Sequence, residues 1–166
     1  MRIVHKTPLG PVEICKARTE DAFQISELTR QSNLIHRTPE EIESRIADFL
    51  TAKISGTVLA CVGAKHYDLD AEIIALRTAP NFENLGLGKI VLGVIRAELV
   101  KQKKRKIFAL TTEIVAQKLF FPLGFIKVGI QLFGPKILND CLKCPKNIIG
   151  PEGNHLCNEI AVLYQG

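Results

Sequence analysis

A strand, a glycine-containing turn and a long apolar-periodic segment follow one another between Ala71 and Lys101. The strand-like run is "AEIIALRTAP", the turn is "ENLGLGK", and the apolar residues after it recur every three or four positions, as on the buried face of a helix. Gly86 and Gly88 lack a Cβ, so another group can approach the free backbone N–H groups there. A helix N-terminus with exposed amides favours an anion, most often a phosphate.

The known glycine motifs for nucleotides do not match this turn. A dinucleotide fingerprint starting at Gly86 needs glycine where Val91 stands, and a P-loop ending at Gly88 needs glycine where Glu83 stands. A plain tight turn between a strand and a helix is the alternative to a phosphate site.

The remaining segments predict ββ and βα units that form one mixed sheet. Strands are expected over residues 12–17, 56–68, 70–80, 106–112, 125–132 and 158–166, and helices over 18–32, 38–50, 87–101 and 113–125. Thr38 and Glu41 form a predicted capping box at the start of the second helix, with Ile42, Ile46, Phe49 and Leu50 on one face. Residues 133–156 are expected to be irregular.

Length and composition favour one domain over residues 1–166. The net charge of +5 is a mild excess of basic over acidic residues, so we expect no nucleic-acid partner. The basic run "KQKKRK" is interpreted as the solvated end of a helix. No apolar run is long enough to span a membrane, and the N-terminus lacks a signal-peptide core, which favours a cytoplasmic protein without a membrane partner. An odd number of cysteines, five, fits reduced thiols better than a disulfide framework.

The strand–turn–helix resembles motif A of the GNAT superfamily of N-acetyltransferases, whose pattern is Q/R-x-x-G-x-G/A. "KIFALTT" and "LFFPLGFIKVG" resemble the superfamily's later strands and fourth helix. The resemblance implies an α+β, three-layer α/β/α fold with a mostly antiparallel mixed sheet, and acetyl-CoA as co-substrate with its pyrophosphate on the turn. The implied cofactor residues are Leu76, Thr78, Asn84, Leu85, Gly86, Leu87, Gly88 and Lys89.

A narrower resemblance involves "EEIESRIADFLTAKISGTVLACVGA" and the ending "DCLKCPK…CNEIAVL". Both are similar to stand-alone acetyltransferase domains related to N-acetylglutamate synthase. This implies transfer of acetyl to the α-amino group of an amino acid, with glutamate first among the small-molecule acceptors. A homodimer stays an open option.

Glu72 is the candidate general base, because it stands eleven residues before Glu83, the spacing at which histone-type members carry their catalytic glutamate. A strand-capping or substrate-binding role for Glu72 is the alternative. The oxyanion donor is expected to be a main-chain N–H near Arg77 or Thr78.

Two departures from the family pattern limit what the resemblance implies. Glu83 replaces the motif's Gln or Arg beside the expected diphosphate, and Ile74 replaces the arginine of the synthase-like strand. The segment "VAQKLFFPLGF", residues 115–125, also lacks the tyrosine that serves many relatives as general acid. Glu83 and the missing tyrosine favour the alternative to an enzyme, a non-catalytic module that senses acetyl-CoA or coenzyme A or carries the cysteine segment to a partner.

The segment "CLKCPKNIIGPEGNHLC" has three interpretations. Cys141 and Cys144 have the spacing of a zinc knuckle, which His155 and Cys157 could complete, so zinc is considered but not assigned. A reversible disulfide and simple packing of small thiols are the other two.

Overall fold

The computed structural model describes residues 2–31, 35–144, 146–147 and 157–165. The strands are β1 (Arg2–Thr7), β2 (Gly10–Lys16), β3 (Phe49–Ile54), β4 (Thr57–Tyr67), β5 (Asp70–Thr78), β6 (Lys106–Thr112), β7 (Ile126–Val128) and β8 (Glu159–Gln165). The α-helices are α1 (Ala22–Arg30), α2 (Pro39–Glu43), α3 (Leu87–Lys101), α4 (Glu113–Val115) and α5 (Gly134–Lys143).

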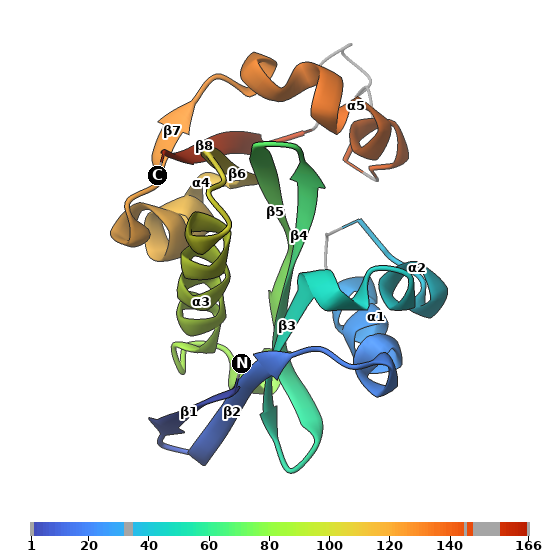
Figure 1. The fold of residues 1–166 in the computed structure, drawn as a ribbon, viewed down its shortest axis with the longest axis vertical. Coiled ribbons are helices and arrows are strands. Elements are labelled where there is room, and N and C mark those ends of the chain that lie inside the picture. The colour runs from blue at the N-terminus through green and yellow to red at the C-terminus, as the bar shows by residue number, and fades with distance from the viewer. Residues whose placement is uncertain (1, 32–34, 145, 148–156, 166) are drawn as a thin grey trace.

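The strands form one sheet in the order β1-β2-β3-β4-β5-β6-β8-β7. Every neighbouring pair is antiparallel except β5 and β6. Figure 1 shows α3 along one side of β4 and β5, with α1 and α2 on the other side. The expected α+β fold, a mostly antiparallel mixed sheet flanked by helices, is confirmed.

The side chains of β6 alternate between two hydrophobic clusters, as the two-residue period of a strand requires. Ile107 and Ala109 pack in the cluster that contains the buried face of α3. Phe108 packs on the opposite face with Phe133 and with Ile137 of α5. The face opposite α3 is therefore covered by α1 and α2 over one half of the sheet and by α5 over the other.

The predicted capping box before α2 is confirmed. Thr38 Oγ1 accepts a hydrogen bond from the Glu41 amide at 3.3 Å, and Glu41 Oε2 accepts one from the Thr38 amide at 3.0 Å. The expected length of the helix is wrong, because α2 ends at Glu43 and Phe49 and Leu50 begin β3. Pairing of β3 with both β2 and β4 satisfies more backbone groups than one further helical turn would.

Two other expectations about the C-terminal part are also wrong. Residues 134–143, expected to be irregular, form α5, in which Pro135 stands in the first turn, where its missing N–H costs nothing. The strand expected over 125–132 is reduced to Ile126–Val128, because only these residues pair with β8 before a 3-10 turn begins. Within the described ranges, no helix is long and apolar enough to cross a membrane.

Strands β5 and β6 separate in the middle of the sheet. Their described pairing ends at Glu72 opposite Phe108, although β5 continues to Thr78 and β6 to Thr112. At this point Ala75 has a φ of +53°, and the β4–β5 register shifts between Cys61 and Gly63. A bulge bends a strand and strengthens its twist, which here turns β5 away from β6.

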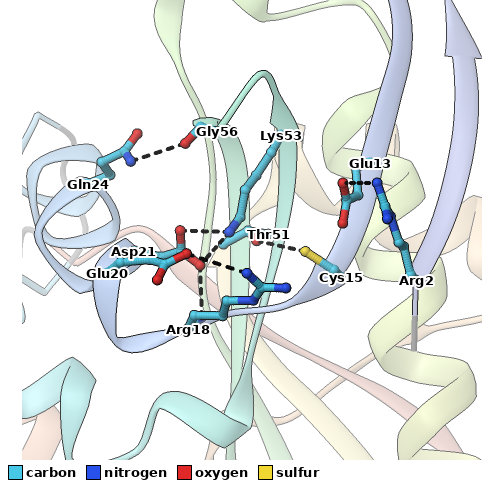
Figure 2. Close-up of polar contacts among 10 residues, drawn as sticks. All are labelled: Arg2, Glu13, Cys15, Arg18, Glu20, Asp21, Gln24, Thr51, Lys53 and Gly56. Atoms are coloured by element: carbon cyan, nitrogen blue, oxygen red, sulfur yellow. Dashed lines mark hydrogen bonds and ion pairs between the residues drawn. The ribbon is translucent and has the colours of Figure 1, made fainter.

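A buried ion pair fixes the start of α1 to β3 (Figure 2). Lys53 Nζ lies 2.6 and 2.7 Å from the two carboxylate oxygens of Asp21, and the Arg18 amide donates to Asp21 Oδ2 at 2.8 Å. The Asp21 side chain is only 2% exposed and that of Lys53 11%. A buried charge is tolerated when its lone pairs are satisfied in this way.

We expect Asp21→Asn to lower the free energy of unfolding by about 1.5 kcal/mol, because Lys53 then donates to a neutral oxygen in a buried setting. Urea denaturation followed by circular dichroism measures this change. The control is Glu20→Gln, because Glu20 and its partner Arg18 are both 71% exposed and 3.6 Å apart, a surface pair of little value. Equal stability of Asp21→Asn and wild type would contradict the role of this ion pair.

Candidate active site

A cavity of about 450 Å³ lies where β5 and β6 separate. Both strands contribute to its wall, and the segment before α2, the helix α5 and the start of β8 complete it. Its charged lining residues are Arg37, Glu72, Arg77, Asp140, Lys146 and Glu159. The apolar part of the wall includes Val115 and Phe120, at the two ends of the segment where α4 passes into a π-helical turn. Such turns occur frequently at functional sites.

Glu72 is the buried carboxylate of this cavity, with only 4% of its surface exposed. It is the last residue of β5 that pairs with β6, and Tyr67 donates a hydrogen bond to its Oε2 at 3.0 Å. Burial raises the pKa of Glu72 above its ordinary value, although the hydrogen bond from Tyr67 acts in the opposite direction. A carboxylate with a raised pKa at the wall of a cavity is suited to accept a proton from an amine.

The cations near Glu72 are held by other carboxylates. Asp140 of α5 binds Arg37 Nη2 at 3.4 Å and Lys65 Nζ at 3.2 Å. Lys146 lies 3.0 Å from Glu159 Oε1. These pairs join the segment before α2, β4, α5 and β8 around one cavity, which gives the site a fixed shape.

One edge of β5 is open along the cavity. Leu76 lies on the wall, beyond the last described pair of β5 and β6, while β4 pairs with the other edge. Backbone N–H groups of a strand alternate in direction, so those that face the open edge can donate to a ligand. The expected amide donor for a developing oxyanion belongs to this segment, and its assignment to Arg77 or Thr78 stays a prediction.

The glycine turn joins the end of β5 to α3. Gly86 is the N-cap residue with a φ of +80°, and its carbonyl accepts the first helical hydrogen bond, from the Ile90 amide at 3.1 Å. A Cβ added at Gly88 would lie 3.3 Å from Thr78 Oγ1, so the backbone of the turn is packed closely against the strand. The structure thus confirms a helix N-terminus at this turn, and the first amides of a helix have no partner within the helix.

The other residues of the turn differ in what they can contribute. Leu87 is 1% exposed, so its side chain belongs to the core and only its backbone can meet a ligand. Asn84 and Lys89 are exposed, and Leu85 packs against the core. Residues 84–89 are not part of the cavity lining, whereas Glu72 and Leu76 are, so the predicted site residues lie in two neighbouring regions along β5.

The charge of Glu83 is compensated, which the sequence did not indicate. Arg77 Nη1 donates to Glu83 Oε1 at 3.0 Å, and Arg77 also lines the cavity. An opposite charge at this distance offsets the repulsion that Glu83 would exert on a diphosphate. Ile74, which replaces the arginine of the synthase-like strand, is 6% exposed and packs against α1.

Five residues of the site were not predicted from the sequence. They are Arg37, Tyr67, Asp140, Lys146 and Glu159. Arg37 precedes the capping box directly and Tyr67 is one of two tyrosines, but neither observation points to a cavity formed mainly by β5 and β6. Hydrogen bonds between residues more than sixty positions apart in the sequence join α5 to Tyr67 and Lys65.

The zinc hypothesis stays open. His155 lies outside the described residues, and among the residues that are described no group of three histidine, cysteine or acidic side chains could hold a metal ion. Burial, followed by the nearby Cys144 and Cys157, raises the pKa of Cys141, which disfavours the thiolate that a metal or an oxidant requires. All five cysteines are free thiols in the structure.

Comparisons with known proteins find acetyltransferases among the similar sequences. An uncharacterized N-acetyltransferase of Chlorobaculum tepidum is 29% identical over 161 residues, which is 94% of this chain and 97% of that protein. An amino-acid acetyltransferase of Haemophilus ducreyi is 28% identical over 106 residues, 63% of this chain but only 24% of the relative. The chain thus spans about a quarter of the length of that enzyme.

The solved structures include N-acetylglutamate synthase from Neisseria gonorrhoeae complexed with coenzyme A and N-acetyl-glutamate. It has 21% sequence identity and a TM-score of 0.73, over 93% of this chain and 35% of that one. At 21% sequence identity, this similarity shows that the two chains share a fold. The model of the acetyltransferase (GNAT) family matches residues 13–125, which include the end of β2, all of β3 to β6, the glycine turn and Glu72. The chain therefore belongs to the acetyltransferase (GNAT) family of transferases.

Proposed function

We propose that this chain transfers an acetyl group from acetyl-CoA to the α-amino group of an amino acid, with glutamate first among the candidates. We further propose that residues 1–166 act as one acetyltransferase domain. The observation that carries the proposal is the buried Glu72 in the wall of a cavity that lies beside the open edge of β5.

The proposed chemistry begins with deprotonation of the acceptor. An ammonium group cannot attack a thioester, so its proton passes to the Glu72 carboxylate, whose pKa burial raises toward the working range of a base. The amine nitrogen then forms a bond to the acetyl carbon, while a backbone N–H of β5 donates to the carbonyl oxygen. The C–S bond breaks, the electron pair leaves with the coenzyme A sulfur, and the surplus proton of the newly acylated nitrogen passes to that thiolate or to water.

The turn at the end of β5 fits the diphosphate of acetyl-CoA. The free amides at the start of α3 supply donors and the positive end of a 15-residue helix. The exposed Gly86 in its left-handed conformation and the close approach of Gly88 to Thr78 leave backbone rather than side chains at the surface. Leu76, Thr78 and residues 84–89 are accordingly proposed as the cofactor site.

The charges of the cavity favour a dipolar acceptor. Three cationic side chains, Arg37, Arg77 and Lys146, are matched by the carboxylates Glu72, Asp140 and Glu159. A cavity that binds a polyamine would need an excess of carboxylates, because a polyamine carries only positive charges. An amino acid has one positive and one negative charge, which matches this balanced lining. The names of the amino-acid acetyltransferase relatives support the same class of acceptor.

We expect Arg37→Ala to raise the KM for the amino acid about tenfold, because a guanidinium at the cavity wall is lost as a partner for the acceptor carboxylate. The KM for acetyl-CoA should stay unchanged, and steady-state kinetics measures both. Arg30→Ala is the matched control, because Arg30 is 59% exposed on α1 and pairs with its neighbour Glu27. An unchanged KM for the amino acid would remove Arg37 from the acceptor site.

Incubation of the protein with acetyl-CoA and a panel of acceptors tests the proposed function. Release of free thiol should depend on an amino acid and exceed the rate with polyamines or peptides bearing a free N-terminus. Release with polyamines alone would overturn the assignment of the acceptor. Binding of acetyl-CoA without turnover of any acceptor would instead favour a non-catalytic module.

A further inference from the structure

The hydroxyl group of Tyr67 stands between two acceptors. It lies 3.0 Å from Glu72 Oε2 and 3.0 Å from the carbonyl oxygen of Lys136 in α5. A phenol has a single hydrogen to donate, so it can serve only one of them at a time, while its oxygen can still accept a bond. Two good acceptors for one hydrogen make this hydroxyl a group that can change its donor direction without moving the ring.

The strand register places Tyr67 on the same face as Glu72. Lys65 is directly opposite Glu72 and Tyr67 is opposite Asp70, so Tyr67 and Glu72 are diagonal neighbours on one face of the β4–β5 hairpin. The ring is held independently of its hydroxyl, by Phe108 at a centroid distance of 6.2 Å and by the cations of Lys65 and Lys136 at 5.5 and 5.8 Å. Loss of the hydroxyl alone should therefore leave the ring in place.

We propose that Tyr67 is a positioning residue that keeps Glu72 hydrogen-bonded through a full proton cycle. Its hydroxyl donates to the ionised carboxylate before proton uptake. After uptake, it donates to the Lys136 carbonyl oxygen and accepts the new hydrogen of the Glu72 carboxyl group. In this change no covalent bond to carbon forms or breaks. The proton that Glu72 takes up stays on its carboxyl group, and Tyr67 keeps its own proton. The inference rests on the proposed role of Glu72 as base.

Among the charged groups near Glu72 in the described part of the chain, none is a dedicated partner of its carboxylate, so the hydrogen bond from Tyr67 has this role. The charged groups near Glu72 are Lys65 of β4, Arg37 of the segment before α2, and Asp140 of α5, and Cys141 of α5 is the neighbouring thiol. Asp140 binds both Lys65 and Arg37, so neither cation is dedicated to Glu72. Burial and the Glu72 carboxylate raise the pKa of Tyr67, so its hydroxyl keeps its proton and remains a donor.

Tyr67→Phe removes the hydroxyl and keeps the ring. The ionised form of Glu72 then loses its donor, so the pKa of Glu72 should rise and the acidic limb of the kcat/KM profile should move to higher pH. We expect activity on that limb to fall about tenfold, while the two profiles converge at alkaline pH and the KM for acetyl-CoA stays the same. Tyr164→Phe is the matched control, because Tyr164 packs against Phe125 and Arg96, away from the cavity. Coincident profiles for Tyr67→Phe and wild type would overturn the proposal.

A second readout needs no catalysis. The chain has two tyrosines, so Tyr164→Phe leaves Tyr67 as the only site for 3-fluorotyrosine. The fluorine resonance of Tyr67 should follow the protonation of Glu72 with pH, and this dependence should disappear in Glu72→Gln. A resonance that does not respond to Glu72 would overturn the proposal, even if Tyr67→Phe fails to fold.

The two readouts separate this inference from the proposed function. Absence of turnover with every acceptor, together with a fluorine resonance that titrates with Glu72, would refute the proposed function and retain the coupled pair. Turnover with a resonance indifferent to Glu72 would refute the pair and retain the function.

Discussion

Glu72→Gln should lower the turnover of the protein by about a hundredfold, because glutamine occupies the same volume but cannot accept a proton from the acceptor amine. The acidic limb of the pH profile should also flatten, because the group whose ionisation produces that limb is absent. Affinity for acetyl-CoA should not change, since the glycine turn lies at the other end of β5. Steady-state kinetics over a range of pH and calorimetry with acetyl-CoA measure these quantities.

Glu13→Gln is the matched control for this prediction. It makes the same chemical change on β2, where Glu13 pairs with Arg2 at 2.9 Å and does not line the cavity. Wild-type turnover of Glu72→Gln would remove Glu72 as the base and would leave a water relay or an acceptor that arrives neutral.

The pKa of Glu72 also provides a test that the Glu72→Gln variant is folded. Burial raises this pKa in the folded chain, so the stability that Glu72 contributes is present below its unfolded pKa and is lost as the pH rises through its folded pKa. Glutamine does not ionise and avoids this loss. At about pH 8, Glu72→Gln should therefore unfold at the same or a higher temperature than wild type.

Gly88→Val should weaken the binding of acetyl-CoA by about 2 kcal/mol or more, equivalent to roughly thirtyfold in the dissociation constant. The added Cβ would lie 3.3 Å from Thr78 Oγ1 and 3.7 Å from Leu119 Cδ1, so the larger side chain would push the turn away from β5 and displace the amides expected to hold the diphosphate. Isothermal titration calorimetry with acetyl-CoA measures the loss directly.

Gly93→Val is the matched control for Gly88→Val. It places the same side chain in the same helix α3, where a Cβ would meet no described atom within 4 Å outside its chain neighbours and the helix's own backbone. Its affinity for acetyl-CoA should equal that of wild type. Unchanged affinity in a folded Gly88→Val variant would show that the turn does not bind the diphosphate.

The parts of the fold that were predicted correctly depend on local patterns. The β4–β5 hairpin has two apolar runs around a short polar turn, and α3 has an apolar face that repeats over 15 residues. The capping box at Thr38 was recognised because its hydrogen bonds join residues three apart. Patterns of this kind are complete within one segment, so the sequence alone contains them.

The parts that were missed depend on distant partners. Phe49 and Leu50 continue the helical period of α2, but the gap between β2 and β4 requires a strand there. The ten residues of α5 contain proline and cysteine, which suggested a loop, and their helical face becomes evident only when Ile137 packs on Phe108 and Phe133. Local preference is overridden where tertiary pairing satisfies more of the backbone.

The candidate site shows the same division. Glu72 and the glycine turn were found because they belong to one contiguous motif. Tyr67, Arg37 and Asp140 were not, because the strand register and the packing of α5 bring them to Glu72 from separate parts of the chain. The pairing of Arg77 with Glu83 spans six residues across the end of β5, and no periodicity of a strand or a helix predicts it.

Following a labelled acetyl group tests the central claim most directly. Acetyl-CoA carrying ¹³C in the acetyl carbonyl is incubated with the protein and with glutamate or another amino acid, and the products are identified by mass spectrometry. We predict a labelled N-acetyl amino acid and an equal amount of free coenzyme A, both formed about a hundredfold more slowly by Glu72→Gln. Labelled acetate as the only product, or acetyl-CoA that binds and is recovered intact with every acceptor, would contradict this account.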